Sequence, residues 1–324
     1  CYINGLIKKY NLGQQKLRHS GKRTAYMKQH IKEFITENKN NMLVLNELAK
    51  REHIPDNIKT EVIESDSNEI KENICKINDY MKETNTILDE AVHGHKIAKR
   101  QIERIIGQWI NGEQNGYCFG FEGPPGVGKT SLARKGLAKC LKSDDGSYRP
   151  FSFIALGGSS NGSTLSGHNY TYVGSTWGRI VDILIEKKCM NPIIFIDELD
   201  KISKTENGKE IIGILTHLVD PTQNESFQDK YFSGIDLDLS KALFIFSYND
   251  VNLIDRVLLD RIHRVKFNHL TLEDKQTITT EYILPELYKK VGVEDIIQLN
   301  DDIITFIIES YTNEAGVRKL KEIL

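Results

Sequence analysis

The sequence predicts an α/β fold, in which a parallel β-sheet is covered on both faces by helices and is preceded and followed by helical segments. Between residues 117 and 268, five short apolar runs alternate with helical stretches, a pattern typical of a sheet buried on both faces. Residues 24–110 instead place apolar residues at helical spacing, and strand-like runs are nearly absent there. Helical spacing returns after Thr271.

The individual elements follow from local patterns. Helical spacing is carried by Ile31, Phe34 and Ile35, and later by Ile97, Ile102, Ile105 and Ile106. Segment 51–68 holds a proline and a polar cluster, which predicts a break between helices. The expected strands lie in YCFGFEG (117–123), FSFIALGG (151–158), IIFIDE (193–198), ALFIFSYN (242–249) and HRVKFN (263–268). Thr271 and Asp274 have the spacing of a capping box, which predicts a helix start.

Composition excludes several classes of protein. With 324 residues, 39% hydrophobic and 27% charged, the chain is long enough for two or three globular domains. Its five cysteines are scattered without C-x-x-C spacing, which disfavours a disulfide framework or a zinc site. No apolar run reaches the roughly 18 residues that cross a bilayer. We expect an intracellular, cytoplasmic protein without a membrane partner, with the mitochondrial matrix or another reducing compartment left open.

The first 32 residues are strongly basic. They contain no Asp or Glu and eight basic residues: Lys8, Lys9, Lys16, Arg18, Lys22, Arg23, Lys28 and Lys32. Such an arm can bind nucleic acid or anionic lipid. Because no aromatic and glycine pattern accompanies the charges, a solvated helix face is the preferred interpretation, and weak nucleic-acid binding is the alternative.

The segment GFEGPPGVGKTS carries the strongest chemical signal. It contains the pattern G-x-x-x-x-G-K-T after an apolar strand and before a helix, which is the context of a phosphate-binding loop. Backbone amides at the helix start cradle phosphates, Lys129 faces the β and γ phosphates, and the Thr130 hydroxyl ligates Mg²⁺. The residues assigned to this loop are Gly123, Pro124, Pro125, Gly126, Val127, Gly128, Lys129, Thr130 and Ser131.

The segment NPIIFIDELDK brings two carboxylates to the end of a buried strand. An unpaired charge is costly there, and a metal ion explains Asp197, which can hold Mg²⁺ through water. Glu198 can then act as general base toward the attacking water. Either carboxylate alone could simply cap the next helix, but the pair downstream of a phosphate loop favours hydrolysis of ATP.

Three further polar residues are candidates for the same reaction. Asn249 follows an apolar strand and can reach the attacking water or the γ phosphate, although a turn residue fits equally well. Arg261 and Arg318 can neutralise charge on the transferred phosphoryl group. Arginines on helices are usually ion-pair partners, so spacing alone does not assign these two.

These segments resemble the ATPase module of the Lon protease family, a branch of the AAA+ ring ATPases. The resemblance runs over residues 89–324 and includes GPPGVGKTSLARK, GHNYTYVGSTWGRI, NPIIFIDELDKI, LVDPTQNESFQDKYF and NEAGVRKL. It implies a P-loop fold with three layers around a parallel sheet and a helical lid. We therefore expect a helical segment over residues 1–88, the large ATPase domain over 89–270 and the small lid domain over 271–324.

The resemblance also implies roles for particular residues. Tyr172 and Val173 would form the pore loop that grips an extended polypeptide, between glycines such as Gly167 and Gly174. Arg261 would be the finger that reaches the ATP of a neighbouring subunit. The remaining implied contacts with the nucleotide are Asn249 as the sensor after a strand, Arg318 as the sensor of the lid, and Val92, His93, Gly94 and Tyr282 near the adenine.

Two departures from the family pattern limit what carries over. Family members place arginines around the pore loop, where this chain has Ser166, Asn169 and Tyr170, so contacts between subunits there are not implied. The family continues into a serine-lysine peptidase domain beyond the segment that ends here at Leu324. We expect the peptidase dyad to lie outside this chain.

The resulting hypothesis is an ATP-driven unfoldase and translocase of a Lon-like serine protease. It would bind ATP and Mg²⁺, assemble as a homo-oligomer, expected to be a hexamer, and act on unfolded or damaged proteins. Two alternatives remain at this point. One is an AAA+ nucleic-acid motor or loader, which the basic first 32 residues motivate, and the other is a stand-alone remodelling ATPase without a peptidase.

Overall fold

The computed structural model describes residues 75–110, 118–142, 146–157, 161–292 and 299–324. The basic residues 1–32, the expected break in 51–68 and most of the N-terminal helical segment lie outside these ranges. The chain divides into two compact units, Cys1–Met81 and Lys82–Leu324. Of the first unit only residues 75–81 are described, and they are helical. Everything below concerns the second unit.

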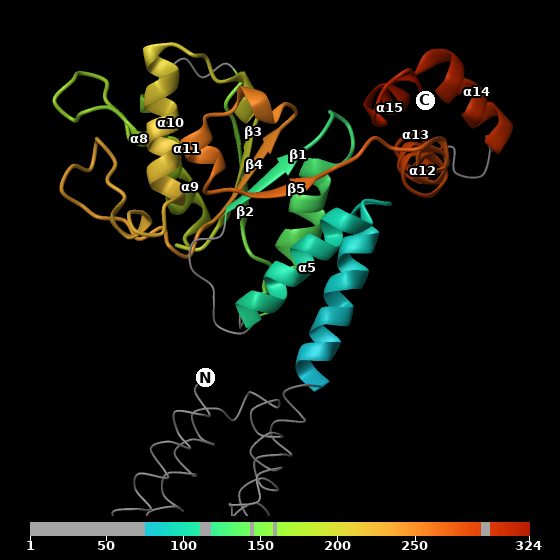
Figure 1. Ribbon diagram of the computed structural model, residues 1–324, viewed down its shortest axis with the longest axis horizontal. Coiled ribbons are helices and arrows are strands. Elements are labelled where there is room, and N and C mark those ends of the chain that lie inside the picture. The colour runs from blue at the N-terminus through green and yellow to red at the C-terminus, as the bar shows by residue number, and fades with distance from the viewer. Residues whose placement is uncertain (1–74, 111–117, 143–145, 158–160, 293–298) are drawn as a thin grey trace, which may run out of the picture. The chain divides into compact units, whose positions relative to one another are not determined.

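A five-stranded sheet forms the centre of the second unit, and its strands run parallel in the order β2-β3-β4-β1-β5 (Figure 1). The strands are β1 Cys118–Glu122, β2 Phe151–Ala155, β3 Ile193–Asp197, β4 Leu243–Tyr248 and β5 His263–Lys266. Each lies within one of the five predicted apolar runs, so the predicted parallel α/β fold is confirmed. Because all strands run in one direction, the segments that follow β1, β3 and β4 emerge at the same edge of the sheet.

Helices cover one face of the sheet through a large apolar core. Ile194 and Ile196 of β3 and Phe244 and Phe246 of β4 project into this core. The helices that pack there are α9 Arg179–Lys187, α10 Glu206–Val219 and α11 Arg256–Leu259. The short α8 Ser163–Ser166 contributes Leu165 to the same core.

The other face of the sheet is aromatic. Phe121 lies 6.4 Å from Phe195 and 5.1 Å from Phe267 between ring centroids. Trp109 of α5 (Lys96–Ile110) makes an edge contact with Phe119 at 6.2 Å. Alternate side chains of the strands are therefore buried on opposite faces of the sheet. Figure 1 shows α10 on one side of the sheet and α5 on the other. Ile97 of α5, one of the residues with helical spacing, is exposed.

The helix after β1 is continuous from Lys129 to Cys140, although its turns change type. It comprises α6 Lys129–Ser131, a π-helical stretch η1 Leu132–Leu137 and α7 Ala138–Cys140. Three short 3₁₀ turns follow strands or helices elsewhere: η2 Leu199–Lys201, η3 Asn224–Ser226 and η4 Val251–Leu253.

The C-terminal helices form a smaller core of their own. They are α12 Leu272–Ile278, the π-helical η5 Thr279–Ile283, α13 Leu284–Val291, α14 Asp301–Tyr311 and α15 Arg318–Ile323. Leu284, Ile304, Ile308 and Leu320 are buried against one another. Thr271 and Asp274 make both bonds of the predicted capping box, so that prediction is confirmed.

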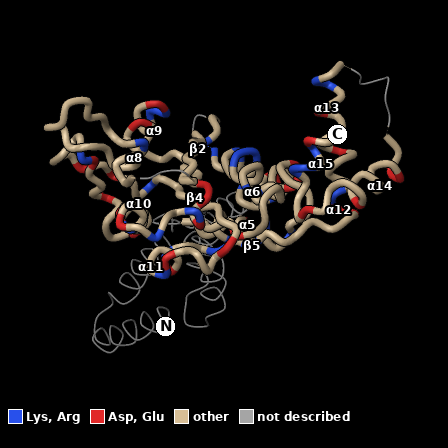
Figure 2. The backbone as a smooth tube through the Cα atoms, turned by 90° about the horizontal axis from the view of Figure 1, so that it is seen from above, with Lys and Arg blue, Asp and Glu red and all other residues tan. Residues whose placement is uncertain are grey.

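Charge is mixed over the described residues. Figure 2 shows acidic and basic residues interspersed along the described chain, without a continuous basic stripe in that part. Among the described helices, none is both long and apolar enough to cross a bilayer.

Candidate active site

The phosphate loop leaves β1 at Glu122 and enters the helix at Lys129. Gly126 and Gly128 have φ angles of 77° and 95°, in the left-handed region that favours glycine. A Cβ atom at Gly128 would also lie 3.0 Å from Val92. The loop therefore needs glycine at this position for both its backbone and its packing, and the turn leaves the amides of the helix start open for an anion.

Lys129 is buried and ties the phosphate loop to the end of β4. Its Nζ donates to the carbonyl oxygens of Gly123 at 2.6 Å and Tyr248 at 3.1 Å, and to Oδ1 of Asn249 at 2.8 Å. Burial lowers the pKa of the Lys129 ammonium, while Asp197 and Asp200 oppose that shift. The predicted lysine and the predicted asparagine thus meet directly.

The carboxylate pair lies where β3 ends. Oδ1 of Asp197 accepts from the backbone N of Glu198 at 2.9 Å. Glu198 has φ 62°, a left-handed conformation that is uncommon outside glycine and often marks a functional site. Its carboxylate forms an ion pair with Lys201. The backbone of Gly157 lies so close that a Cβ there would be 1.6 Å from Oε2 of Glu198.

Asp200 is a site residue that the sequence reasoning missed. Its Oδ2 accepts from the backbone N of Asn249 at 3.1 Å and of Asp250 at 3.3 Å. Asp200 therefore joins the turn after β3 to the turn after β4 and fixes the backbone of Asn249. The third carboxylate in DELDK was the available signal, but its partners lie 49 and 50 residues further along the chain.

A cleft of about 650 Å³ brings most predicted residues together. Asp197, Glu198 and Asn249 line it opposite the C-terminal helices. The other predicted residues in its wall are Pro125, Gly126, Val127, Gly128, Lys129, Thr130, Ser131, Val92, His93, Tyr282 and Arg318. Gly123, Pro124, Gly94 and Arg261 are outside the lining. Gly123 still contributes through its carbonyl bond to Lys129.

The segment 92–95 lies beside the phosphate loop. Nε2 of His93 is 3.5 Å from Oδ1 of Asp274 in α12. Nε2 of His95 donates to the carbonyl oxygen of Val127 at 3.0 Å, and its ring lies 5.0 Å from that of Phe267. Burial lowers the pKa of His95, which keeps its ring neutral near pH 7. His95 was not predicted, yet it supports the loop directly.

The lid touches the phosphate loop through backbone. The N of Val317 donates to the O of Gly126 at 3.2 Å, and a Cβ at Gly316 would lie 2.4 Å from the carbonyl carbon of Gly126. Arg318 follows at the start of α15 with its side chain 75% exposed. The lid arginine therefore lies at the edge of the cleft with an exposed side chain, and its Nε is 3.8 Å from Oε1 of Glu322.

Arg261 is held elsewhere. Its Nε and one terminal nitrogen donate to Oδ2 of Asp220 at 3.1 and 2.9 Å, and another donates to the carbonyl O of Val257. Hydrogen bonds from Thr222, and then from Arg261, lower the pKa of Asp220 to about 2. Asp220 belongs to the DPTQN segment and was not predicted as a partner.

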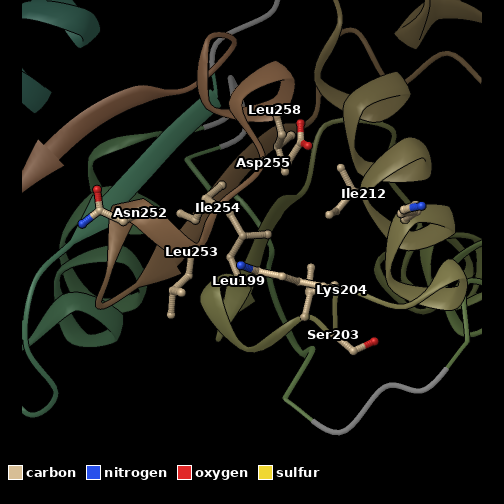
Figure 3. A pocket seen from close by; sticks show the side chains of 11 residues that line it. Leu199, Ser203, Lys204, Ile212, Asn252, Leu253, Ile254, Asp255 and Leu258 are labelled. Atoms are coloured by element: carbon tan, nitrogen blue, oxygen red, sulfur yellow. The ribbon is translucent and has the colours of Figure 1, made fainter.

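A smaller hollow of about 250 Å³ lies between the segments that follow β3 and β4 and the helices α10 and α11. Leu199, Ile254, Leu258 and Ile212 are among its lining residues, as Figure 3 shows. They belong to the segments that follow Glu198 and Asn249 and precede Arg261, and to α10. Apolar packing thus holds the two strand ends and α11, which precedes Arg261, against α10.

The Tyr172 loop follows α8 and projects from the rest of the unit (Figure 1). Tyr172 is 68% exposed and Val173 fully so. Both Gly167 and Gly174 have left-handed φ angles, 74° and 84°. An aromatic and an aliphatic side chain are therefore presented to solvent at the tip of a glycine-flanked loop.

Comparison with known proteins agrees with this geometry. Residues 119–270 match the family model of AAA, the ATPase family associated with various cellular activities. Residues 289–324 match the model of the Lon protease AAA+ ATPase lid domain.

Full-length relatives show the same likeness. A Lon protease homolog of Acanthamoeba polyphaga mimivirus is 41% identical over 256 residues, which are 78% of this chain and 24% of that protein. The Lon protease of Campylobacter concisus is 40% identical over 219 residues, 67% of this chain and 26% of that protein. A mitochondrial Lon protease homolog of Drosophila melanogaster is 35% identical over 252 residues, 78% of this chain and 23% of that protein.

The parallel sheet, the phosphate loop at its edge and the match over 119–270 define the class: the chain is an AAA ATPase with a nucleotide-binding domain. Its lid and its relatives are those of one branch. The chain belongs to the Lon family, and it carries the ATPase and lid segments of that family. It spans about a quarter of the length of the curated relatives it matches.

Proposed function

We propose that this chain binds ATP with Mg²⁺ in the 650 Å³ cleft, hydrolyses it, and uses the energy to draw a polypeptide past Tyr172 in a ring of identical subunits. The observation that carries the proposal is the convergence of Lys129, Glu198 and Asn249 in one cleft. A phosphate loop, a general base and a sensor amide at one edge of a parallel sheet are the parts that phosphoryl transfer to water requires.

The residues fit ATP and Mg²⁺. The left-handed Gly126 and Gly128 leave backbone space for phosphates, and Thr130 and Asp197 line the same cleft. The described residues contain no cluster of three or more His, Cys, Asp or Glu suited to a metal. Magnesium in such sites keeps several waters and uses phosphate oxygens, so one hydroxyl and one carboxylate suffice. Bound Mg²⁺ would neutralise charge on the phosphates.

The chain's own residues would then divide the work. Lys129 would exchange some of its partners for phosphate oxygens, because its ammonium already donates to Gly123, Tyr248 and Asn249. Glu198 would accept the proton of the attacking water at its carboxylate, after release from Lys201. Asn249, fixed by Asp200, would orient that water. Arg318 would fold over the phosphates from the lid.

We assign Arg261 to the active site of a neighbouring copy. Its position outside the lining of its own cleft and its partly exposed side chain, 34% accessible, support this assignment. An arginine supplied by a second chain stabilises charge on the transferred phosphoryl group. Such a head-to-tail contact closes into a ring, and we propose a hexamer.

The substrate, the domain limits and the location are part of the same proposal. Unfolded or damaged proteins would be gripped by the exposed Tyr172 and Val173, and in the complete protein a serine peptidase would degrade them. The large ATPase domain would occupy residues 89–270 and the lid 271–324. The mitochondrial relative fits an intracellular place of action, cytoplasmic or mitochondrial.

Two substitutions in the full-length protein test this function. Glu198→Gln should still bind ATP but lose about 10²- to 10⁴-fold in the rate of hydrolysis, because the general base is removed.

Tyr172→Ala should keep ATP hydrolysis and lose unfolding of a folded model substrate, while Tyr172→Phe keeps both. Tyr311→Ala, a similarly exposed tyrosine on the lid, is the matched control. Normal unfolding by Tyr172→Ala would refute the assignment of the loop, and DNA binding that depends on residues 1–32 and stimulates hydrolysis would favour the nucleic-acid motor.

A further inference from the structure

The stem of the Tyr172 loop, residues 165–168 and 176–178, is closed by tight backbone contacts. The N of His168 donates to the O of Thr176 at 3.1 Å. A Cβ at Gly178 would lie 2.1 Å from the carbonyl O of Leu165 and 2.6 Å from the N of Gly167. Gly167 and Gly178 therefore lie backbone against backbone. The segment between them, with Tyr172 at its tip, leaves and re-enters the domain at this one contact.

Asp229, from a segment 51 residues away, lies at this point. Its side chain is fully buried, with 0% exposure. Oδ2 accepts from the backbone N of Gly178 at 2.8 Å, and Oδ1 accepts from the backbone N of Tyr231 at 2.8 Å. A Cβ at Gly167 would lie 2.7 Å from Oδ1 of Asp229. A buried carboxylate is costly unless it is satisfied, and charge-assisted bonds from two backbone amides satisfy it.

The neighbours of Asp229 make further contacts with the loop stem and with α10. The backbone N of Lys230 donates to the O of Ser166 at 2.8 Å, and Nζ of Lys230 pairs with Glu210 of α10 at 2.7 Å. The ring of Trp177 stacks on Phe232 at 5.9 Å and meets Tyr231 edge-on at 5.8 Å. The loop stem is thus fastened to the α/β body through residues 229–232.

We propose that Asp229 is a positioning residue for the Tyr172 loop: it locks the stem so that a pull on the tip is borne by the domain. This inference rests on the function proposed above. A tip that grips a polypeptide transmits force only if its base is rigid. Loss of one hydrogen bond to the charged group would free Gly178 while leaving Tyr172 exposed and chemically unchanged.

The test distinguishes substrate binding by the Tyr172 loop from the ability to unfold a bound substrate. In the full-length protein, Asp229→Asn keeps the side-chain shape but can accept only one of the two amide bonds. The rate of unfolding a stably folded substrate should fall about tenfold, the factor expected for one lost hydrogen bond to a charged group. The KM for that substrate, ATP turnover without substrate, and degradation of the same substrate after chemical unfolding should stay near wild type.

Matched variants keep the result interpretable. Asp236→Asn removes a charge from an exposed carboxylate close in sequence, which accepts from Gln228, and should change nothing. Trp177→Ala should also lower the rate of substrate unfolding, because it removes the ring that stacks on Phe232. Trp177→Phe keeps an aromatic ring there and should unfold substrate at the wild-type rate. Trp177 is 41% exposed, so neither change opens a cavity in the core.

The outcomes distinguish this inference from the proposed function. An unchanged unfolding rate in Asp229→Asn overturns the positioning role. A parallel fall in basal ATP turnover also overturns it, since that indicates general damage to the fold. If Tyr172→Ala unfolds substrate normally, the proposed function itself fails, whatever Asp229→Asn does.

Discussion

At the scale of single residues, the geometry around Glu198 is the most demanding. Its left-handed backbone, φ 62°, turns the chain sharply after β3, and the side chain passes directly over the backbone of Gly157. Strained backbone of this kind costs on the order of 1–3 kcal/mol and persists where the surroundings enforce it. Here Oδ1 of Asp197 accepts from the backbone N of Glu198, and Asp200 accepts from the backbone N of Asn249, which fixes the turn after Glu198.

Gly157→Ala should therefore impair catalysis without weakening nucleotide binding. The new Cβ would lie 1.6 Å from Oε2 and 2.7 Å from Cδ of Glu198, so the carboxylate must swing away. We expect kcat for ATP hydrolysis to fall at least about tenfold, toward the loss from removing a general base, with the Kd for ATP unchanged by titration calorimetry. Gly213→Ala is the control, because no atom lies within 4 Å of its Cβ. Equal turnover in both variants would contradict the assignment of Glu198.

At the scale of elements, the phosphate loop and the lid meet through close backbone contacts. Gly316 lies against Pro125 and Gly126, and Val317 donates to Gly126. Glycine permits this approach because a side chain at either position would separate the two elements. A change in the phosphate loop would therefore be felt directly at the start of α15.

Gly316→Ala should loosen this contact. Its Cβ would meet the carbonyl carbon of Gly126 at 2.4 Å, so the lid must retreat with Arg318. We expect ATP affinity to fall roughly tenfold, the effect of about 1.4 kcal/mol, measured with a fluorescent nucleotide. Gly107→Ala in α5, which has open space around its Cβ, should bind normally. Wild-type affinity in Gly316→Ala would show that the contact does not govern binding.

The same elements show what the sequence made predictable. The five strands, the phosphate loop and the capping box at Thr271 follow from local patterns of apolar residues, glycines and polar caps. Glu198 and Asn249 were predicted because each follows an apolar strand, and the parallel sheet brings both to one cleft. Asp200 and Asp229 were missed because each acts on a backbone amide 49 to 51 residues away. Such pairings depend on the tertiary fold and leave no spacing to detect.

At the scale of the whole molecule, the proposed active site needs residues of two chains. The cleft contains the phosphate loop, the carboxylates and the lid arginine, while Arg261 is bonded to Asp220 outside its lining. The account therefore requires a second copy to supply the arginine. The Tyr172 loop also lies outside the cleft lining. Under the proposed function, force on a polypeptide would reach the loop through the part of the domain that Asp229 joins to it.

The most direct measurement is ATP hydrolysis by mixed assemblies of the full-length protein. Each variant alone, Glu198→Gln or Arg261→Ala, should hydrolyse ATP about 10²-fold or more slowly than wild type. The two are co-expressed with different affinity tags, and assemblies that contain both are isolated by two successive affinity steps. Random mixing should restore about one quarter of the wild-type rate, because half the sites keep Glu198 and half of their neighbours supply Arg261. A mixed preparation no more active than the separate variants, or full activity of Arg261→Ala alone, would contradict an active site shared between two copies.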